Sequence, residues 1–380
     1  MMSTKPKRIM LVYTALIPSV YLCGYVQLQY LCEHGFIEFE AKRFADITKD
    51  DVLRADIVLF IRNDSLQDVW LAKQCRKAGK YLIYVLDDDL LNVPSYISSA
   101  RYYQNPSIRA QIKQMMALCD CFMSPSEVLL AKYGKRFSRV FRVIEPSVMQ
   151  VTEITPHQDG CVHIGFAGSA DRGKDLDEIL GGAIEAVIRK YPERVIVEIF
   201  GAETELSKRL GLKTYPYLDA YSEYQSLMKE LHWDIGLAPM PDSAFHRCKH
   251  CNKLVEYAGF GIVGIYSDVI PYSNAVEDGV TGLLCEDTEN AWTAAISRLV
   301  EDNVLRKSMQ ENCLRLAGET YSIERTAMEL LEQLQQCGTS RQPESNLPLY
   351  TLQKLWIRAV RLGKRVWLAV LKRTLWKIKG

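Results

Sequence analysis

The feature that most constrains the fold is a repeated alternation of short apolar runs with amphipathic segments. In the first part of the chain the apolar runs predict strands at residues 8–13, 37–40, 57–62, 81–86, 121–123 and 140–144. Helical patterns occur between several of these runs, at residues 20–32, 67–78, 108–119 and 126–133. Because each return to a parallel strand needs a crossover connection, the alternation predicts a Rossmann-like α/β unit.

A second series of the same kind begins near residue 163. It predicts strands at residues 163–167, 195–200, 235–239 and 262–266, with helices at residues 176–190 and 221–231. We therefore expect two facing Rossmann-like domains, residues 1–150 and residues 160–335, joined by a polar linker at residues 146–160 that contains two prolines. Ligands of open parallel sheets bind outside the carboxyl ends of the strands, so residues that follow predicted strands are the best site candidates.

Composition is compatible with two globular domains. The chain has 380 residues, of which 48% are hydrophobic and 24% charged. Its eleven cysteines show no regular spacing, which favours a reducing cytoplasm over a disulfide scaffold. Three basic residues precede an uncharged run at residues 9–32, a pattern that invites a signal peptide or a membrane span. Polar residues divide this run into a strand, a loop and a helix, so we expect neither.

One acidic residue, Glu256, stands on the helix predicted to begin near residue 252. Asn252 is a plausible N-cap, and glycines end the helix before the strand at residues 262–266. Near a helix N-terminus the dipole favours negative charge, and a carboxylate can accept a pair of hydrogen bonds from a vicinal diol such as a ribose. The alternative is a solvated glutamate in a first helical turn, which is the commoner case for this helix taken alone.

The segment around Glu256 carries further elements in a fixed order. They are Lys253, the run EYAGFGIV at residues 256–263, the pair Ser267 and Asp268, and the run DGVTGLL at residues 278–284. This order resembles the nucleotide-sugar donor signature of GT-B glycosyltransferases of the glycogen-synthase-like, retaining type (group 1, family 4-like). The resemblance implies a GT-B fold, a ribose contact for Glu256 and retention of anomeric configuration. Many members carry an earlier glutamate eight positions before the one matching Glu256, where this chain has Cys248.

A glycine-containing loop follows the first strand predicted for the second domain. Gly168 lets a ligand approach the backbone closely, and Ser169 follows it as a further candidate donor-binding residue. Arg172 and Lys174 could neutralise a diphosphate as negative charge builds on the leaving group. The loop resembles the basic pair that the family carries after this strand, at a shorter spacing. Taken alone, the loop is equally well explained as a glycine turn that carries two solvated basic side chains.

Two lysines flank the start of the Glu256 helix. Lys249 and Lys253 lie where ammonium groups and backbone N–H groups could share one anion. Together with Leu254 they complete the predicted donor-binding set.

A C-x-x-C pair formed by Cys248 and Cys251, flanked by His246 and His250, invites a zinc or redox hypothesis. No second ligand pair occurs at zinc-site spacing, so we expect free thiols and no metal.

Three consecutive acids, Asp87, Asp88 and Asp89, follow the predicted strand at residues 81–86. At that edge they would face the cleft between the domains, where an acceptor hydroxyl needs a base or a hydrogen-bond acceptor. We therefore predict them as acceptor-side catalytic candidates. A D-x-D triplet is also the metal-binding motif of the GT-A fold, but the two-domain pattern argues against that transfer. The alternative is a solvated helix cap.

The C-terminal part is distinct in composition. Residues 336–349 are linker-like, and residues 350–380 carry nine Lys or Arg and no Asp or Glu. The rest of the chain holds 38 basic and 46 acidic residues, a formal charge of −8. Apolar residues, three tryptophans among them, recur in residues 350–380 at helical spacing opposite the basic ones, which predicts an amphipathic helix lying on an anionic membrane surface. The alternative is a helix packing back on the acidic body; we expect no nucleic-acid partner.

These features together predict a cytoplasmic, membrane-peripheral GT-B glycosyltransferase. It would move a sugar from a nucleotide-diphosphate donor to a glycan or lipid-linked acceptor, in the synthesis of a surface polysaccharide or glycolipid. No cofactor is expected, because cations of the protein can neutralise the departing diphosphate without a metal. Two alternatives remain: a nucleotide-sugar epimerase of related fold, and a non-catalytic membrane-docked partner of a glycan synthase.

Overall fold

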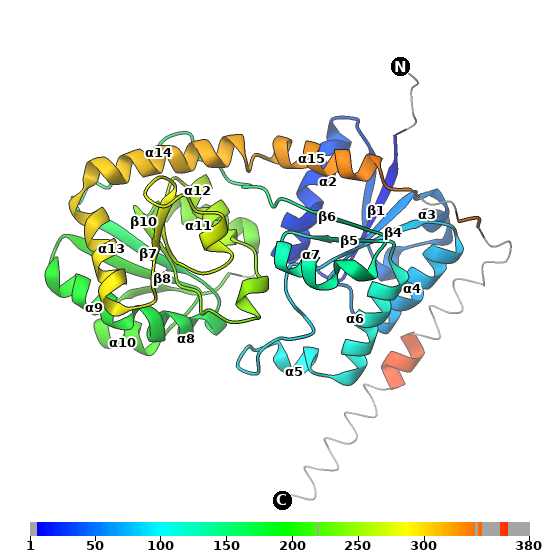
Figure 1. Cartoon of the computed structure of the whole chain (residues 1–380), viewed down its shortest axis with the longest axis horizontal. Coiled ribbons are helices and arrows are strands. Elements are labelled where there is room, and N and C mark those ends of the chain that lie inside the picture. Colours follow the sequence, from blue (N-terminus) through cyan, green and yellow to red (C-terminus); the bar gives the residue numbers. More distant parts are fainter. Residues whose placement is uncertain (1–5, 219, 339–340, 344–357, 364–380) are drawn as a thin grey trace, which may run out of the picture.

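The computed structural model describes residues 6–218, 220–338, 341–343 and 358–363. Within these residues the strands form two parallel sheets of six strands each, and each sheet lies in its own α/β unit (Figure 1). The two units lie side by side along the long axis of the molecule, as two facing domains should. The predicted fold class is therefore confirmed.

The first sheet has the strand order β2-β1-β3-β4-β5-β6. Its strands are β1 (Arg8–Tyr13), β2 (Glu38–Arg43), β3 (Ile57–Ile61), β4 (Tyr81–Val85), β5 (Cys121–Ser124) and β6 (Arg139–Arg142). Every residue of the central strands β3 and β4 is buried, which explains their continuous apolar sequences IVLFI and YLIYV. Parallel strands have such continuous apolar sequences because helices cover both faces of their sheet.

Helices cover the two faces of the first sheet. They are α1 (Pro18–Val20), the π-helical turn η1 (Tyr21–Tyr25), α2 (Val26–Glu33), α3 (Lys49–Arg54), α4 (Leu66–Lys77), α5 (Ala100–Tyr103), α6 (Pro106–Leu118) and α7 (Glu127–Tyr133). Side chains of Thr48, Ser65, Asn105 and Ser126 accept backbone N–H groups at the start of α3, α4, α6 and α7. These caps satisfy donors that a helix cannot pair internally, and so fix where the four helices begin.

The second sheet has the order β12-β11-β10-β7-β8-β9. Its strands are β7 (Val162–Ala167), β8 (Val195–Phe200), β9 (Lys213–Tyr215), β10 (Ile235–Ala238), β11 (Val263–Ser267) and β12 (Gly282–Cys285). The helices of this part of the chain are α8 (Gly173–Asp175), the π-helical turn η5 (Leu176–Leu180), α9 (Gly181–Lys190), α10 (Glu205–Leu210), α11 (Tyr221–Leu231), α12 (Asn252–Gly259), α13 (Glu289–Glu301) and α14 (Asn303–Glu319). Two glycines let aromatic side chains pack directly on this sheet. A Cβ at Gly165 would overlap the ring of Trp233, and a Cβ at Gly236 would overlap the ring of Tyr257.

The last long helix, α15 (Ile323–Gln335), returns to the first unit. It continues from α14 and lies beside α2 (Figure 1). Its buried residues Ala327, Leu330, Leu331 and Leu334 join the apolar cluster that contains strand residues of β1 and β3. The predicted limits of the second domain, residues 160–335, therefore include a helix that the structure packs on the first sheet.

The strand predictions agree with the structure to within a few residues at each end, because every buried parallel strand is a nearly uninterrupted apolar run. The last residues of the segment at residues 278–284 begin strand β12, which lies at the edge of the second sheet and is not among the predicted strands. Asn252 is the first residue of α12, and Cys251 occupies the cap position without a side-chain cap.

Most of the predicted tail helix lies outside the described residues. Of residues 350–380, only 358–363 are described, and these are helical. No helix in the described part of the chain is both long enough and apolar enough to cross a bilayer.

Candidate functional site

A cavity of about 280 Å³ lies between the two units, at the carboxyl ends of their strands. Pro18 and Leu22 of the first unit form one side of it, and residues 145–149, which follow β6, form another. The second unit contributes the rest, including Gly168, Ser169, Phe200, Tyr217, Tyr221, Tyr224, Asn252, Lys253, Val255 and Glu256. Four of the predicted donor-site residues therefore line one cavity: Gly168, Ser169, Lys253 and Glu256.

Glu256 points into this cavity from α12 and is held by two partners. Lys253, one helical turn earlier, lies with its Nζ 2.9 Å from Oε2 of Glu256. Tyr224 of α11 donates its hydroxyl hydrogen to Oε1 of Glu256. The Glu256 side chain is 14% exposed, so it is not the solvated surface acid of the alternative interpretation. Tyr224 could not be found from the sequence, because its pairing with α12 depends on tertiary packing.

Burial opposes charge on both members of the Lys253–Glu256 pair. It raises the pKa of Glu256 to about 8. Burial, assisted by the positive charge of Arg172, lowers the pKa of Lys253 to about 7. The two pKa values thus lie close to each other and to neutral pH. A ligand that donates to the carboxylate or brings an anion to the amine will favour the charged forms.

Glycines let two loops approach each other beside the cavity. Gly201, just after β8, has a φ of 83°, and a Cβ there would lie 2.1 Å from the carbonyl oxygen of Gly168. A Cβ at Gly168 would in turn meet Arg172 and Phe166 at 2.9 Å. Gly168 and Ser169 line the cavity, and the absence of a side chain at Gly168 and Gly201 lets the loops after β7 and β8 meet beside it.

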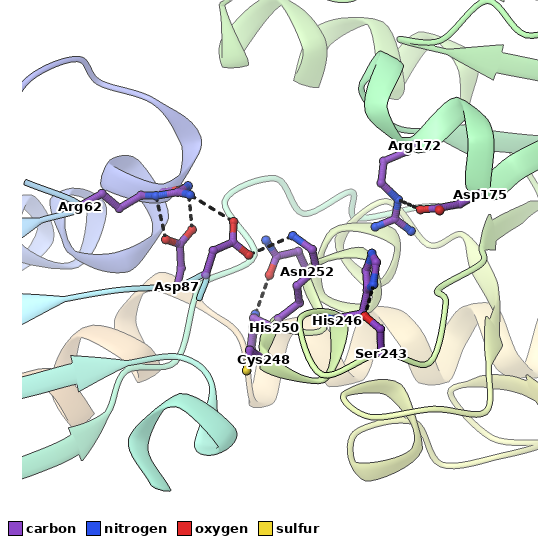
Figure 2. A network of polar contacts seen from close by, with 12 residues as sticks. Arg62, Asp87, Arg172, Asp175, Ser243, His246, Cys248, His250 and Asn252 are labelled. Atoms are coloured by element: carbon purple, nitrogen blue, oxygen red, sulfur yellow. Dashed lines mark hydrogen bonds and ion pairs between the residues drawn. The ribbon is translucent and has the colours of Figure 1, made fainter. Parts of the chain in front are cut away.

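The two cations after β7 have different environments. Arg172 closes the 3₁₀ turn at residues 170–172, with its Nε 2.8 Å from Oδ2 of Asp175 (Figure 2). It also donates to the carbonyl of Pro239, and its charge acts on Lys253. Lys174 is 60% exposed, lies 3.4 Å from Glu178 and stands over the ring of Tyr96. The structure thus brings Arg172, but not Lys174, to the cavity lysine.

Asp87 and Asp88 share one arginine, and Asp88 faces the second unit across the cleft. Arg62, the residue after β3, places Nε 3.3 Å from Oδ1 of Asp87 and Nη2 3.2 Å from Oδ2 of Asp88 (Figure 2). Burial raises the pKa of Asp87, although Arg62 opposes this. Burial would raise the pKa of Asp88 too, but Lys249 and Arg62 lower it to about 2.

Lys249 pairs across the cleft instead of lining the cavity. Its Nζ lies 2.9 Å from Oδ1 of Asp88, which links the segment before α12 to the loop after β4. A second contact between the units joins Ser98 to Asp171, with Oγ 2.7 Å from Oδ2. The predicted donor lysine and the predicted acceptor acid are therefore partners in this structure. Leu254, the remaining donor-set residue, is fully buried in the apolar core beneath the cavity.

Asp89 has a structural environment unlike that of its two neighbours. It is 1% exposed and accepts hydrogen bonds from the hydroxyl of Tyr133 at 2.6 Å and from the amide of Asn92 at 3.0 Å. Lys132 adds an ion pair at 2.5 Å. All of these partners belong to the first unit, so Asp89 joins α7 to the loop after β4 and does not face the cleft.

The C-x-x-C pair does not form a compact site. Cys248 is buried in an apolar cluster of the first unit, while the Sγ of Cys251 lies 3.6 Å from Nε2 of His250. Nδ1 of His250 lies 3.4 Å from Oε2 of Glu145, a residue that also lines the cavity. All eleven cysteines are described and are free. Within the described residues, no group of three or more His, Cys, Asp or Glu side chains could hold a metal ion.

Comparisons with known proteins give similarity in structure but not in sequence. Scans against protein-family models and against curated proteins gave no match. HepE of Anabaena in complex with UDP-glucose superposes with a TM-score of 0.59 at 13% identity, over 86% of this chain and 99% of HepE. Sucrose-phosphate synthase of Thermosynechococcus elongatus gives 0.59 at 12% identity, over 87% and 98%. A Listeria monocytogenes protein assigned as a UDP-N-acetylglucosamine 2-epimerase gives 0.53 at 14% identity, over 87% and 96%.

The structural neighbours include GT-B glycosyltransferases, and their alignments extend over both α/β units. Two facing units, each built on a parallel sheet, with a cavity between their carboxyl edges, are the same arrangement. The chain therefore has the GT-B fold.

The different environments of Asp88 and Asp89 predict different effects on stability. Asp89→Ala should lower the free energy of unfolding by about 3–5 kcal/mol, because it leaves Lys132 and two buried donors without their shared acceptor. Asp88→Ala should lower the free energy of unfolding by less than about 1.5 kcal/mol. Arg62 retains its ion pair with Asp87, and the Lys249 side chain is partly exposed to solvent. Urea unfolding followed by circular dichroism measures both losses. Equal losses would contradict the structural assignment of Asp89.

Proposed function

We propose that this protein is a glycosyltransferase that moves a sugar from a nucleotide-diphosphate sugar to an acceptor. The observation that carries the proposal is the Lys253–Glu256 pair, which faces a cavity between two Rossmann-like units that Gly168 also lines. A partly buried carboxylate next to an amine suits a ligand that offers both a diol and an anion. A nucleoside diphosphate is such a ligand.

In the proposed complex each residue of the pair meets the part of the donor that favours its charged form. Ribose hydroxyls would donate to Glu256, which lowers the pKa of its carboxyl. The diphosphate would lie near Lys253 and Arg172, which raises the pKa of the amine and stabilises the charge on the leaving group. Binding would therefore complete a charge arrangement that burial alone disfavours. With these cations in place the proposed reaction needs no metal cofactor.

In the proposed reaction, the first unit provides the residues that meet the acceptor. Asp87 and Asp88 lie across the cleft from the donor cavity, within reach of Arg62. Asp87 is the better base candidate, because burial raises the pKa of its carboxyl whereas that of Asp88 is low. A glycan or a lipid-linked sugar would supply the hydroxyl. Retention of anomeric configuration is part of the proposal through the resemblance of the donor segment.

The neighbouring proteins support two different reactions on this fold. HepE was crystallised with UDP-glucose, and sucrose-phosphate synthase is named for a synthesis that joins a sugar to an acceptor. The Listeria protein of similar fold is assigned as an epimerase, which supports the second candidate reaction. An epimerase acts on its nucleotide sugar without an acceptor, so the two candidates differ in a measurable requirement.

Substitutions in the cavity should remove donor binding. Glu256→Ala and Arg172→Ala should each weaken the binding of a nucleoside diphosphate by at least about tenfold, since each loses a charge-assisted hydrogen bond to the ligand. Calorimetry with UDP, GDP and ADP measures the affinity. Glu324→Ala is a matched control, because Glu324 is an exposed acid in the first turn of α15. Unchanged affinity in both cavity variants would refute the donor-site assignment.

Incubation with a nucleotide sugar alone separates the transferase from the epimerase. We expect slow release of the nucleoside diphosphate and free sugar, because without an acceptor only water can take the glycosyl group. Chromatography and NMR of the sugar products follow the reaction. Accumulation of an epimeric nucleotide sugar, with the bond between the diphosphate and the sugar intact, would contradict the transferase proposal.

Residues 350–380 support the further proposal that the protein works in the cytoplasm at an anionic membrane surface. Nine basic residues and interfacial tryptophans at helical spacing are the composition of such a surface helix. Deletion of residues 346–380 should abolish sedimentation with vesicles that contain phosphatidylserine, whereas the full chain should sediment with them and not with neutral vesicles. Equal sedimentation of the full and the shortened chain would refute the anchor.

A further inference from the structure

His246 is a buried side chain in the cleft that neither the donor signature nor the mechanism above uses. It opens the 3₁₀ turn η6 (His246–Cys248), which lies between β10 and α12, and it is only 1% exposed. At the other end of the same turn, Cys248 packs into the apolar cluster of the first unit. His246 is thus the polar side chain that this turn buries in the cleft.

Ser243 makes two hydrogen bonds with His246. The hydroxyl oxygen of Ser243 accepts the backbone N–H of His246 at 3.3 Å. The same hydroxyl lies 2.8 Å from Nδ1 of the ring (Figure 2). A hydroxyl hydrogen donated to Nδ1 makes that nitrogen an acceptor and puts the hydrogen of the neutral ring on Nε2. Nε2 is buried and has no hydrogen-bond partner in the part of the chain that the structure describes.

The charges around His246 keep its ring neutral. Burial and then the positive charges of Arg172 and Lys249 lower its pKa to about 4, while Asp88 of the first unit has the opposite effect. The positive charge of Arg172 lowers the pKa of both His246 and Lys253. Both neighbouring cations already have carboxylate partners: Arg172 lies 2.8 Å from Asp175, and Lys249 lies 2.9 Å from Asp88.

An N–H donor next to two cations suits an anionic ligand and repels a cationic one. A buried donor without a partner costs free energy, and such a group in a cleft points to a ligand that supplies the acceptor. If Glu256 holds the ribose of a nucleoside diphosphate and Lys253 lies near its phosphates, the phosphates run towards Arg172. Figure 2 shows His246 near Arg172.

We propose that Nε2 of His246 donates a hydrogen bond to a phosphate oxygen of the nucleotide donor, beside Arg172. This inference rests on the proposed function and adds a binding residue to it. The hydrogen bond from the neutral ring to the anionic phosphate is charge-assisted, and it strengthens further when the phosphate favours protonation of the ring.

Calorimetry with inorganic pyrophosphate and with UDP, GDP and ADP tests the proposal. His246→Ala should weaken the binding of the diphosphates that the unmodified protein binds by about tenfold or more. His246→Gln should recover most of this loss, because the glutamine amide carries an N–H at a similar distance from the backbone. Binding of the nucleoside without phosphates should stay the same in both variants.

The pH dependence gives a readout that a purely structural role would not produce. A bound phosphate raises the pKa of His246 above its free value, so the proton is taken up on binding where pH lies below the raised pKa. Affinity for pyrophosphate should therefore increase more steeply between pH 7 and pH 5 in the unmodified protein than in His246→Gln. Equal slopes would contradict contact with the phosphate.

A measurement on the unmodified protein covers the case in which the variants do not fold. Long-range ¹H–¹⁵N NMR of the imidazole should show hydrogen on Nε2 without ligand, and a downfield shift of that hydrogen when pyrophosphate is added. Unchanged resonances in a protein that binds pyrophosphate would overturn the inference. If the unmodified protein binds neither pyrophosphate nor any of the three nucleoside diphosphates, the proposed function itself fails.

Discussion

Coverage of both faces of two all-parallel sheets is the constraint on which this structure depends. Strands such as β3 and β4 are buried over their whole length, so each sheet needs helices on both sides. Part of this cover comes from far along the chain, because the apolar face of α15 packs on residues of β1 and β3. Parallel strands also give each sheet a single carboxyl edge, and the loops after β3, β4, β7 and β10 meet there in the cleft.

Desolvation at that edge explains why charged side chains in the cleft occur in pairs. Lys253 lies against Glu256, Arg172 against Asp175, and Arg62 against both Asp87 and Asp88. An unpaired charge in these positions would cost several kcal/mol, and a partner of opposite charge offsets part of that cost. The pairs thus hold the site in shape before a ligand is present. They also set the chemistry, because a ligand must replace carboxylate partners with its own phosphates and hydroxyls.

Sequence patterns predicted ten of the twelve strands in the described residues, the two α/β units and the helix of Glu256, since these depend on local apolar periodicity and glycine positions. The GT-B fold was predicted from the resemblance of the donor segment. Contacts between distant segments did not follow from the pattern. Tyr224 meets Glu256 only because α11 packs beside α12, and Arg62 meets the acids only because β3 pairs with β4. Lys174 is separated from Arg172 because the loop after β7 continues as a 3₁₀ turn, which directs the two side chains to different partners. The order of helices and strands along the chain likewise does not predict that α15 packs on the first sheet.

The ion pair between Lys249 and Asp88 connects the donor side of the proposed reaction to its acceptor side. Lys249 stands three residues after His246 and three before the start of α12, so it moves with the segment that would hold the donor. Its partner Asp88 moves with the loop that would meet the acceptor. In the proposed reaction, this ion pair therefore couples the position of the segment that would hold the donor to the position of the loop that would meet the acceptor.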